Sequence, residues 1–378
     1  MRLPKNKYVK QVLFLLAVAF IFYFIYYLVK YIRFYMRVHN AKSYISPQYK
    51  VEAVAEEDLN TVTWLIHMYP PIHNAGAEWM AHAMNSSLIA SNYKVNVVLN
   101  KANLSEFERV HIIDKHNQGL VNSAVKHSSV LISHLDMETN AVQTALKAKR
   151  PMVLVMHNNY RKNYLQEFIR VLPNNLYLIH NSYWIKNYYS QYGLPSIVVY
   201  PPVYWKEYHV ETTREYVTLI NLNANKGGDV LYKIAKEMPE VQFMGVKGGY
   251  DGQIIRKGLP NLIYVDNTPY IQEIYKKTDI LLVPSKEESW GRVAVEAMSS
   301  GIPVIANPTP GLLESCGEAG IFCDRNSIAA WVKEIRRLKT DSAWRQEVSE
   351  KCLARAKELD PKGQLDNMAV WLSKLKWR

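Results

Sequence analysis

The sequence predicts an α/β protein in which two parallel-sheet domains follow one long apolar helix. Three observations support this prediction: an uncharged apolar run near the start, an alternation of short β-rich runs with amphipathic stretches, and a restart of that alternation after two adjacent prolines. With 378 residues, of which 48% are hydrophobic, the chain is long enough to bury more than one core.

The apolar run covers residues 11–29 and contains no charged side chain. Its length is close to the roughly 20 residues that a helix needs to cross a bilayer, and tyrosines cluster at its carboxyl end, as they do at a membrane interface. A cleaved signal peptide is the alternative, but the run is long and no small-residue cleavage site follows it. We expect an uncleaved single-pass anchor between a basic tail (1–10) and a juxtamembrane stem (30–58).

The net charge of +12 is concentrated near the start of the chain. Residues 1–50 contain nine Lys or Arg and no acidic residue, which leaves +3 (12 minus 9) for the rest, so we expect no nucleic-acid partner. Basic residues flank the anchor equally, and the positive-inside rule gives no orientation. The three cysteines form no disulfide framework, which favours the cytosolic face, whereas sequons at Asn85 and Asn103 favour a lumenal one. We expect the domains on the cytosolic face.

The first domain is expected over residues 59–203 and the second over 204–360. Both read as Rossmann-like, with buried parallel strands joined by helical segments. The expected strands are 61–69, 94–100, 128–135, 151–157 and 175–181 in the first domain, and 216–222, 241–246, 261–267, 279–285, 302–307 and 319–323 in the second. Ligands of such sheets bind at the carboxyl ends of the strands, so the two domains should face each other across a cleft.

One of these strand ends carries two glutamates. Strand 279–285 ends in PSKEESWG, and a helix should follow from Arg292 to Ser300. The free N–H groups at such a helix start bind phosphate, and Glu288 and Glu296 would flank that site. Two carboxylates beside a phosphate suit a nucleotide sugar, which has hydroxyls on both sides of its diphosphate. The plain alternative for Glu296 is that the helix dipole favours a glutamate there without any ligand.

Three further loops join a strand to a helix through glycine. NKGGD, residues 225–229, places Lys226 where its ammonium would neutralise phosphate, although a lone Lys-Gly-Gly is more often a solvated turn. HNAGAE (73–78) and NPTPGLLE (307–314) are weaker signals of the same kind.

Taken in order, these motifs resemble the retaining glycosyltransferases of the GT-B fold, specifically the large family-4 type. The resemblance covers roughly residues 59–360. It rests on Ala75-Gly76-Ala77-Glu78, Lys226-Gly227, Glu288-x7-Glu296 and Pro310-Gly311-x-x-Glu314 followed by GEAGIF.

The resemblance implies roles for individual residues. Glu296 would hold the ribose hydroxyls, Glu288 would contact the hydroxyls of the transferred sugar, and Lys226 would stabilise the departing diphosphate. The residues implied to bind the donor are Gly76, Asn221, Lys226, Glu288, Trp290, Gly291, Arg292, Glu296 and Gly311. His134 is the candidate histidine near the sugar, with His157 as the competitor, and either could be an ordinary strand-end histidine. The terminal segment 361–378 would return to the first domain as a helix.

The sequence also departs from the family pattern. Asn221 stands where the family usually has an arginine, Ala75 and Pro310 replace glycines, and Arg292 replaces an aliphatic residue and could restore the missing charge. These changes put the donor preference in doubt more than the fold.

The function expected from these residues is the transfer of a sugar from a nucleotide-diphosphate sugar to a glycan or lipid-linked acceptor at a membrane. No Asp-x-Asp occurs, so we expect neither a metal nor another cofactor. A catalytically silent GT-B-like binding or assembly subunit is the alternative, and Asn221 is the residue that favours it. A sugar-nucleotide epimerase shares the fold, but an anchor offers a soluble metabolite enzyme no evident benefit.

Overall fold

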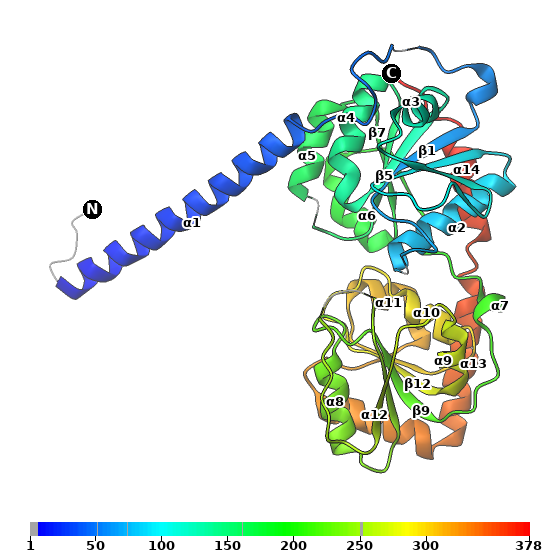
Figure 1. Ribbon diagram of the computed structural model, residues 1–378. Coiled ribbons are helices and arrows are strands. Elements are labelled where there is room, and N and C mark those ends of the chain that lie inside the picture. Colours follow the sequence, from blue (N-terminus) through cyan, green and yellow to red (C-terminus); the bar gives the residue numbers. More distant parts are fainter. Residues whose placement is uncertain (1–6, 51, 74, 161, 250–251) are drawn as a thin grey trace.

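The structure is a computed structural model that describes the chain except for residues 1–6, 51, 74, 161 and 250–251, and except for the side chains of residues 7–14, 162 and 163. Two α/β domains are stacked end to end, and a long helix, α1 (Lys7–His39), projects from the first of them (Figure 1). Residues 1–6 of the predicted basic tail lie outside the described residues. The predicted fold class, two parallel-sheet domains after an apolar helix, is confirmed.

The first domain is built around a sheet with the strand order β3-β4-β2-β1-β5-β6-β7-β8. All pairs of neighbouring strands are parallel except β3–β4. Its strands are β1 (Thr61–Leu65), β2 (Lys94–Leu99), β3 (Glu106–Phe107), β4 (Val110–Asp114), β5 (Val130–His134), β6 (Met152–Met156), β7 (Leu176–His180) and β8 (Ser196–Val198). Its helices are α2 (Gly76–Ala90), α3 (Gln118–Lys126), α4 (Glu138–Ala148), α5 (Lys162–Val171) and α6 (Tyr183–Tyr189). The expected strands did not include β3 and β8, which are the two edge strands, or β4, which lies beside β3.

Both faces of this sheet are covered, and successive strand residues alternate between two cores. Val130 and Ile132 pack in the core that contains α2, whereas Leu131 packs in the core that contains α3, α4 and α5. This burial on both sides explains why the central strands read as continuous apolar runs in the sequence.

The second domain is a wholly parallel sheet with the strand order β11-β10-β9-β12-β13-β14. Its strands are β9 (Tyr216–Ile220), β10 (Phe243–Val246), β11 (Leu262–Val265), β12 (Thr278–Val283), β13 (Val304–Ala306) and β14 (Ile321–Phe322). Its helices are α7 (Trp205–Tyr208), α8 (Gly228–Glu237), α9 (Ile271–Lys277), α10 (Arg292–Met298), α11 (Pro310–Cys316), α12 (Ile328–Thr340) and α13 (Ser342–Glu358). All the strands predicted for this domain are present, with ends that differ by a few residues.

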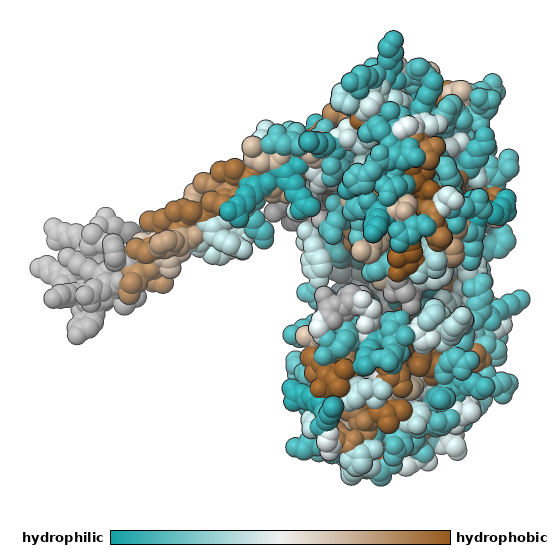
Figure 2. Space-filling model, viewed as in Figure 1, coloured by the Kyte–Doolittle hydropathy of each residue, from teal (hydrophilic) through white to brown (hydrophobic). Residues whose placement is uncertain are grey.

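Helix α1 has an exposed part and a docked part. Leu15–His39 is long and apolar enough to cross a membrane, and Figure 2 shows an apolar surface along the projecting part of the helix. Near its end, Phe34 and Val38 are buried against α4 and α5, and the Phe34 ring lies 4.0 Å from that of Tyr164. The helix therefore continues ten residues beyond the expected boundary at Val29, and the segment expected to be a stem packs into the first domain.

The last helix, α14 (Lys362–Leu372), packs on α2 in the first domain, as the resemblance implied. Its Leu365, Met368 and Leu372 are buried in the same core as Trp64. The chain thus crosses between the domains twice, once before α7 and once between α13 and α14.

The end of β7 carries a buried histidine that makes the stability of the first domain depend on pH. His180 is 2% exposed and stacks on Tyr189, and burial together with the charge of Lys186 lowers its pKa to about 4. In the unfolded chain the pKa is about 6.5, so the unfolded state takes up the proton first as the pH falls. The contribution of His180 to the free energy of unfolding is therefore fully present above about pH 6.5. It decreases as the pH falls toward 4, by about 3 kcal/mol at most.

We expect His180→Phe, which keeps the aromatic stacking but cannot titrate, to lose less stability than the wild type between pH 7.5 and 4.5. The difference should be about 2 to 3 kcal/mol in the free energy of unfolding, measured by urea denaturation at both pH values. His116→Asn, at an exposed histidine of the same domain, is the control and should lose as much as the wild type. An equal loss in all three proteins would contradict the assignment.

Candidate functional site

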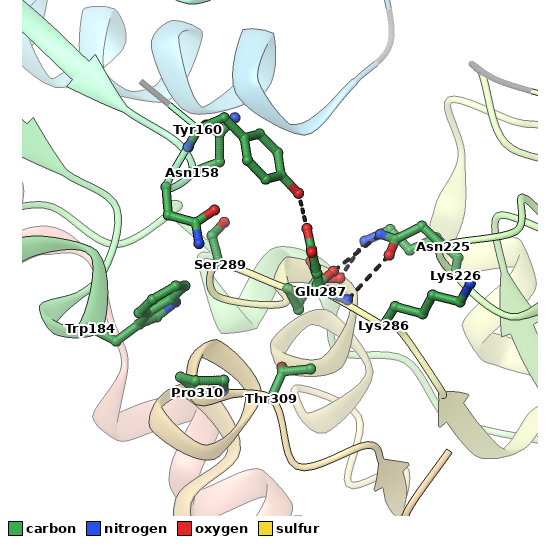
Figure 3. A pocket seen from close by; sticks show the side chains of 12 residues that line it. Asn158, Tyr160, Trp184, Asn225, Lys226, Lys286, Glu287, Ser289, Thr309 and Pro310 are labelled. Carbon is green, nitrogen blue, oxygen red and sulfur yellow. Dashed lines mark hydrogen bonds and ion pairs between the residues drawn. The ribbon is translucent and has the colours of Figure 1, made fainter. Parts of the chain in front are cut away.

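A cavity of about 340 Å³ lies between the carboxyl ends of the two sheets (Figure 3). The first domain contributes the loop after β6 and the start of α6, and the second contributes the loops after β9, β12 and β13. The lining residues are Asn158, Asn159, Tyr160, Trp184, Asn225, Lys226, Lys286, Glu287, Glu288, Ser289, Thr309 and Pro310. A polar cavity at strand ends, with walls from both domains, is the arrangement that the sequence predicted.

Two predicted residues meet in this cavity. The ammonium of Lys226 donates to the carboxylate of Glu288, although the two residues lie in different loops 62 positions apart. Their side chains are 19% and 13% exposed, so the pair is shielded but still accessible from the cavity. Gly227 makes this approach possible because its φ is 97° and a Cβ there would lie 2.7 Å from Pro284. The opposite charges neutralise each other in the ligand-free site.

The loop that carries Lys226 is held by Arg325, which the sequence analysis did not identify. The buried guanidinium of Arg325 donates to the carbonyls of Ala224 and Asn225 at 2.9 Å and to the carbonyl of Pro284, and it pairs with Asp229 at 3.1 Å. It therefore ties the end of β12 to the loop after β9. A single arginine 99 residues after Lys226 carries no local pattern, and only the fold brings the two loops to it.

Glu296 lies deeper than the cavity, 6% exposed, in the second turn of α10. One carboxylate oxygen is 2.7 Å from Nε of Arg292, and the other accepts from the Tyr275 hydroxyl at 2.7 Å. Arg292 also donates to the Tyr208 hydroxyl at 2.6 Å. The Arg292 side chain is thus directed toward Glu296 and Tyr208 in the ligand-free protein, and not toward the cavity, so it does not replace the missing arginine.

The turn before α10 has the geometry expected of a helix start open to an anion. Gly291 is the N-cap residue of α10 and has a φ of 93°, a backbone conformation that only glycine adopts easily. Gly311 is in close contact with this turn, since a Cβ there would lie 2.4 Å from the carbonyl oxygen of Glu288. The ring of Trp290 is buried and stacks on Tyr200 at 5.3 Å, so its side chain supports the link between the domains while its backbone belongs to the turn.

Asn221 does not line the cavity. It is 8% exposed with a φ of 68°, and its amide oxygen accepts from the side chain of Gln253 at 3.1 Å and from the backbone of Asn223 at 3.2 Å. Gly248 packs directly on it. In the ligand-free protein its side chain therefore stabilises the loops after β9 and β10.

The predicted residues of the first domain are not among those that line the cavity. Gly76 begins α2 and is exposed, and none of the described residues has an atom within 4 Å of where its Cβ would lie. His134 ends β5 and is fully buried, and its Nδ1 lies 3.0 Å from Nε2 of His157. Burial lowers the pKa of His134 well below its usual value and that of His157 to about 4, so both rings are neutral at pH 7. The two candidates thus form one pair, next to the cavity residue Asn158.

Contacts across the cleft hold the two domains in this arrangement. The carboxylate of Glu314, from α11, accepts the backbone N–H of Tyr183 at 2.6 Å and of Trp184 at 2.9 Å, at the start of α6. The side chain of Asn181 donates to the hydroxyl of Ser289 at 2.8 Å, and the Tyr160 hydroxyl donates to Glu287. Glu314 was part of the quoted motif, but its role across the domains was not predicted.

Comparison with known proteins gives a match over most of the second domain. Residues 205–358 match the family model "Glycosyl transferases group 1". D-inositol 3-phosphate glycosyltransferase of Corynebacterium glutamicum is 38% identical over 86 residues, which is 22% of this chain and 21% of that protein. O-antigen chain mannosyltransferase B of Escherichia coli is 32% identical over 93 residues, 25% of this chain and 24% of that protein. The chain thus matches only about a fifth to a quarter of the length of these curated relatives.

Solved structures extend the likeness to both domains. Anabaena Alr3699/HepE, solved in complex with UDP-glucose, covers 82% of this chain and 98% of its own with a TM-score of 0.68 at 16% identity. Sucrose-phosphate synthase from Thermosynechococcus elongatus covers 82% of this chain and 98% of its own with a TM-score of 0.66 at 16% identity. Residues 205–358 are therefore similar to the glycosyl transferases group 1 domain, and the chain has the two-domain GT-B fold of these solved structures.

Proposed function

We propose that this protein is a membrane-anchored, retaining glycosyltransferase that moves a sugar from a nucleotide-diphosphate sugar to a hydroxyl of a glycan or lipid-linked acceptor. The observation that carries the proposal is the Lys226–Glu288 pair in a cavity between facing sheets, within a glycosyl transferases group 1 domain. The names of the relatives, which include a mannosyltransferase and a protein solved with UDP-glucose, support a nucleotide-sugar donor.

The ion pair suggests how the donor enters. A diphosphate carries more negative charge than one carboxylate, so it would draw the Lys226 ammonium away from Glu288. Glu288 would then accept hydroxyls of the sugar, while the turn at residues 290–292 offers backbone N–H groups to the phosphates. Binding thus exchanges one ion pair for another and does not expose a buried charge.

Transfer would proceed with the acceptor hydroxyl attacking on the face from which the nucleotide diphosphate leaves, with the phosphate taking the proton. The protein's contribution is orientation and electrostatic stabilisation, chiefly by Lys226. We propose that no metal bridges the diphosphate, because the chain has no Asp-x-Asp.

Helix α1 supports the membrane part of the proposal. Its projecting part is apolar and unburied, and an anchored enzyme would act on an acceptor at the membrane, which we place on the cytosolic face. Since Phe34 and Val38 are buried in the first domain, the anchor would be joined rigidly to that domain. Experiments are therefore best done on the full chain in detergent, because removal of residues 1–40 would strip this packing.

A catalytically silent binding or assembly subunit is the second candidate. Asn221 favours it, since it lacks the charge of the usual arginine and its side chain is engaged within the domain. The presence of Lys226, Glu288 and Glu296 in the expected loops favours the enzyme. Ligand binding separates the two candidates.

The first prediction from the proposed function concerns Lys226. Thermal unfolding of the full chain with UDP, GDP, ADP or CDP and their sugar conjugates should show stabilisation by one nucleotide, about 2.7 kcal/mol at 100 times its dissociation constant. With the sugar donor so found, Lys226→Ala should lower kcat by roughly 10² to 10³, as loss of one oxyanion-hole donor does. Lys236→Ala, on the exposed face of α8, should leave the rate unchanged. If no nucleotide stabilises the folded chain, the silent-subunit candidate replaces the enzyme.

The second prediction concerns Glu296. Glu296→Ala removes the partner of a largely buried arginine, so it should lower the free energy of unfolding by about 3 kcal/mol. The double variant Glu296→Ala with Arg292→Met removes both charges and should recover much of that stability. If Glu296 holds the ribose, the double variant still fails to bind the nucleotide. Recovery of stability together with full nucleotide affinity would exclude the ribose role.

The third prediction concerns the diphosphate. Because Lys226 and backbone N–H groups supply the positive charge, excess chelator should leave the affinity for the nucleotide unchanged, measured by calorimetry on the full chain. Loss of binding in the chelator, with recovery on addition of Mn²⁺, would contradict the proposal.

A further inference from the structure

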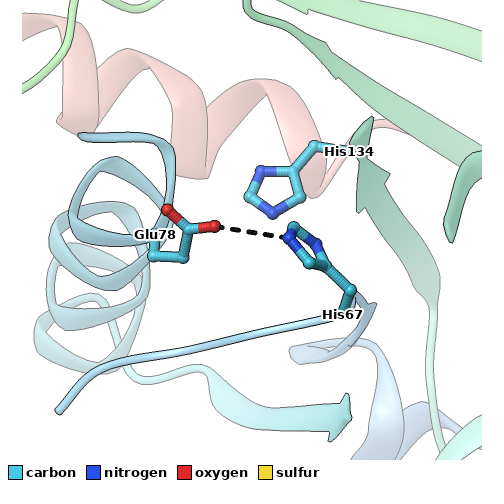
Figure 4. A group of neighbouring side chains, drawn as sticks. All are labelled: His67, Glu78 and His134. Atoms are coloured by element: carbon cyan, nitrogen blue, oxygen red, sulfur yellow. Dashed lines mark ion pairs between the residues drawn. The ribbon is translucent and has the colours of Figure 1, made fainter. Parts of the chain in front are cut away.

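A cluster of titratable side chains lies in the first domain, beside the cavity. His67 follows β1, Glu78 is in the first turn of α2, and His134 ends β5 (Figure 4). Because β1 and β5 are adjacent parallel strands, with Leu65 opposite Ser133, their ends meet at one edge of the sheet. One side-chain ligand atom from each of the three residues lies within 4.8 Å of the other two.

The chemistry of the cluster fits a cation. Two imidazoles and one carboxylate are the protein ligands of many zinc sites. Nε2 of His134 is buried and has no hydrogen-bond partner among the described residues, although a buried polar atom normally has one. The carboxylate of Glu78, only 3% exposed, lies 3.7 Å from Nε2 of His67 and supplies negative charge. A bound cation would satisfy both the carboxylate and the unpartnered nitrogen.

A neighbouring histidine orients the ligand. Nδ1 of His134 lies 3.0 Å from Nε2 of His157. When Nδ1 of His134 is protonated and donates a hydrogen bond to His157, the lone pair of the His134 ring is on Nε2. Hydrogen bonds of this kind fix the tautomer of metal-binding histidines.

The ligand atoms would have to move closer together to bind zinc. Zinc bonds of about 2.0 to 2.1 Å in tetrahedral geometry place ligand atoms about 3.3 Å apart. Nε2 of His67 lies 3.7 Å from the nearer oxygen of Glu78, and the ligand atoms of the three residues all lie within 4.8 Å of one another. We propose that His67, Glu78 and His134 bind a divalent transition-metal ion, preferably Zn²⁺, on the first-domain side of the cleft.

This site is separate from the proposed diphosphate-binding site. Its ligands belong to the first domain, whereas Lys226 and the α10 turn belong to the second. The proposal therefore stands whether or not the chain transfers a sugar. It is also compatible with the proposal that no metal bridges the diphosphate. An open coordination position would suit an oxygen of the acceptor.

The test is a titration of Zn²⁺ into the metal-stripped full chain in detergent, in competition with a chromophoric chelator of known affinity. We expect one Zn²⁺ per chain. Glu78→Gln and His67→Asn should each weaken the affinity at least tenfold, since loss of a hydrogen bond to a ligand alone costs 10- to 100-fold. Co²⁺ in place of Zn²⁺ should give the visible absorption of a nitrogen- and oxygen-ligated tetrahedral ion.

His116→Asn, at an exposed histidine of the same domain, is the matched control and should bind Zn²⁺ as the wild type does. The nucleotide-induced shift and the circular dichroism spectrum establish that each variant is folded, and His67→Asn decides the matter if Glu78→Gln does not fold, because His67 is partly exposed. A wild-type chain that retains no Zn²⁺, or a His67→Asn variant with wild-type affinity, would overturn the proposal.

Discussion

The facing arrangement of the two sheets depends on a carboxylate that caps a helix of the other domain. Glu314 leaves α11 and accepts the first free N–H groups of α6, at Tyr183 and Trp184. A helix start has several unpaired N–H groups, and a charged acceptor binds them more strongly than a neutral one. This contact fixes Trp184 as one wall of the cavity, and the Asn181–Ser289 hydrogen bond holds the neighbouring wall. The cavity thus exists because the domains are held together at its rim.

The second feature of the site is a set of three ion pairs in the ligand-free protein. Lys226 pairs with Glu288, Arg292 with Glu296, and Arg325 with Asp229, so each of these charges is compensated. A buried charge without a partner is costly, so these ion pairs stabilise the loops in the ligand-free protein. In the proposed function, Glu288 becomes available to sugar hydroxyls when a diphosphate binds Lys226.

The first domain differs in kind from the second. Its strand ends carry histidines around one carboxylate, and its outer face holds the end of α1 through Phe34 and Val38. Anchor packing, the histidine cluster and the return of α14 all belong to this domain. The domain therefore combines the features proposed for the acceptor and the membrane, while the second domain holds those proposed for the donor.

The sequence by itself determined the fold class and the loops of the site. Strands buried on both faces appear as apolar runs, and glycine-containing loops after them predicted where Lys226 and Glu288 lie. Strand β4, which lies between β3 and β2, was missed because its Val110–Asp114 run is short and half polar, so burial leaves only a weak pattern. That α1 extends into the first domain was also missed, since an amphipathic helix end looks the same whether it meets lipid, water or protein.

Only the tertiary structure decided which side chains meet. Arg325, Asn221 and Arg292 turn toward partners that lie elsewhere in the chain or deeper in the core, and His67, Glu78 and His134 come together because β1 and β5 are neighbours in the sheet. The hydrophobic periodicity of a sequence indicates which residues are buried, but not which residues they contact in the folded protein. Spacing along the chain therefore predicted the loops that carry Lys226 and Glu288 to the cavity, and it could not predict the histidine cluster or the paired charges.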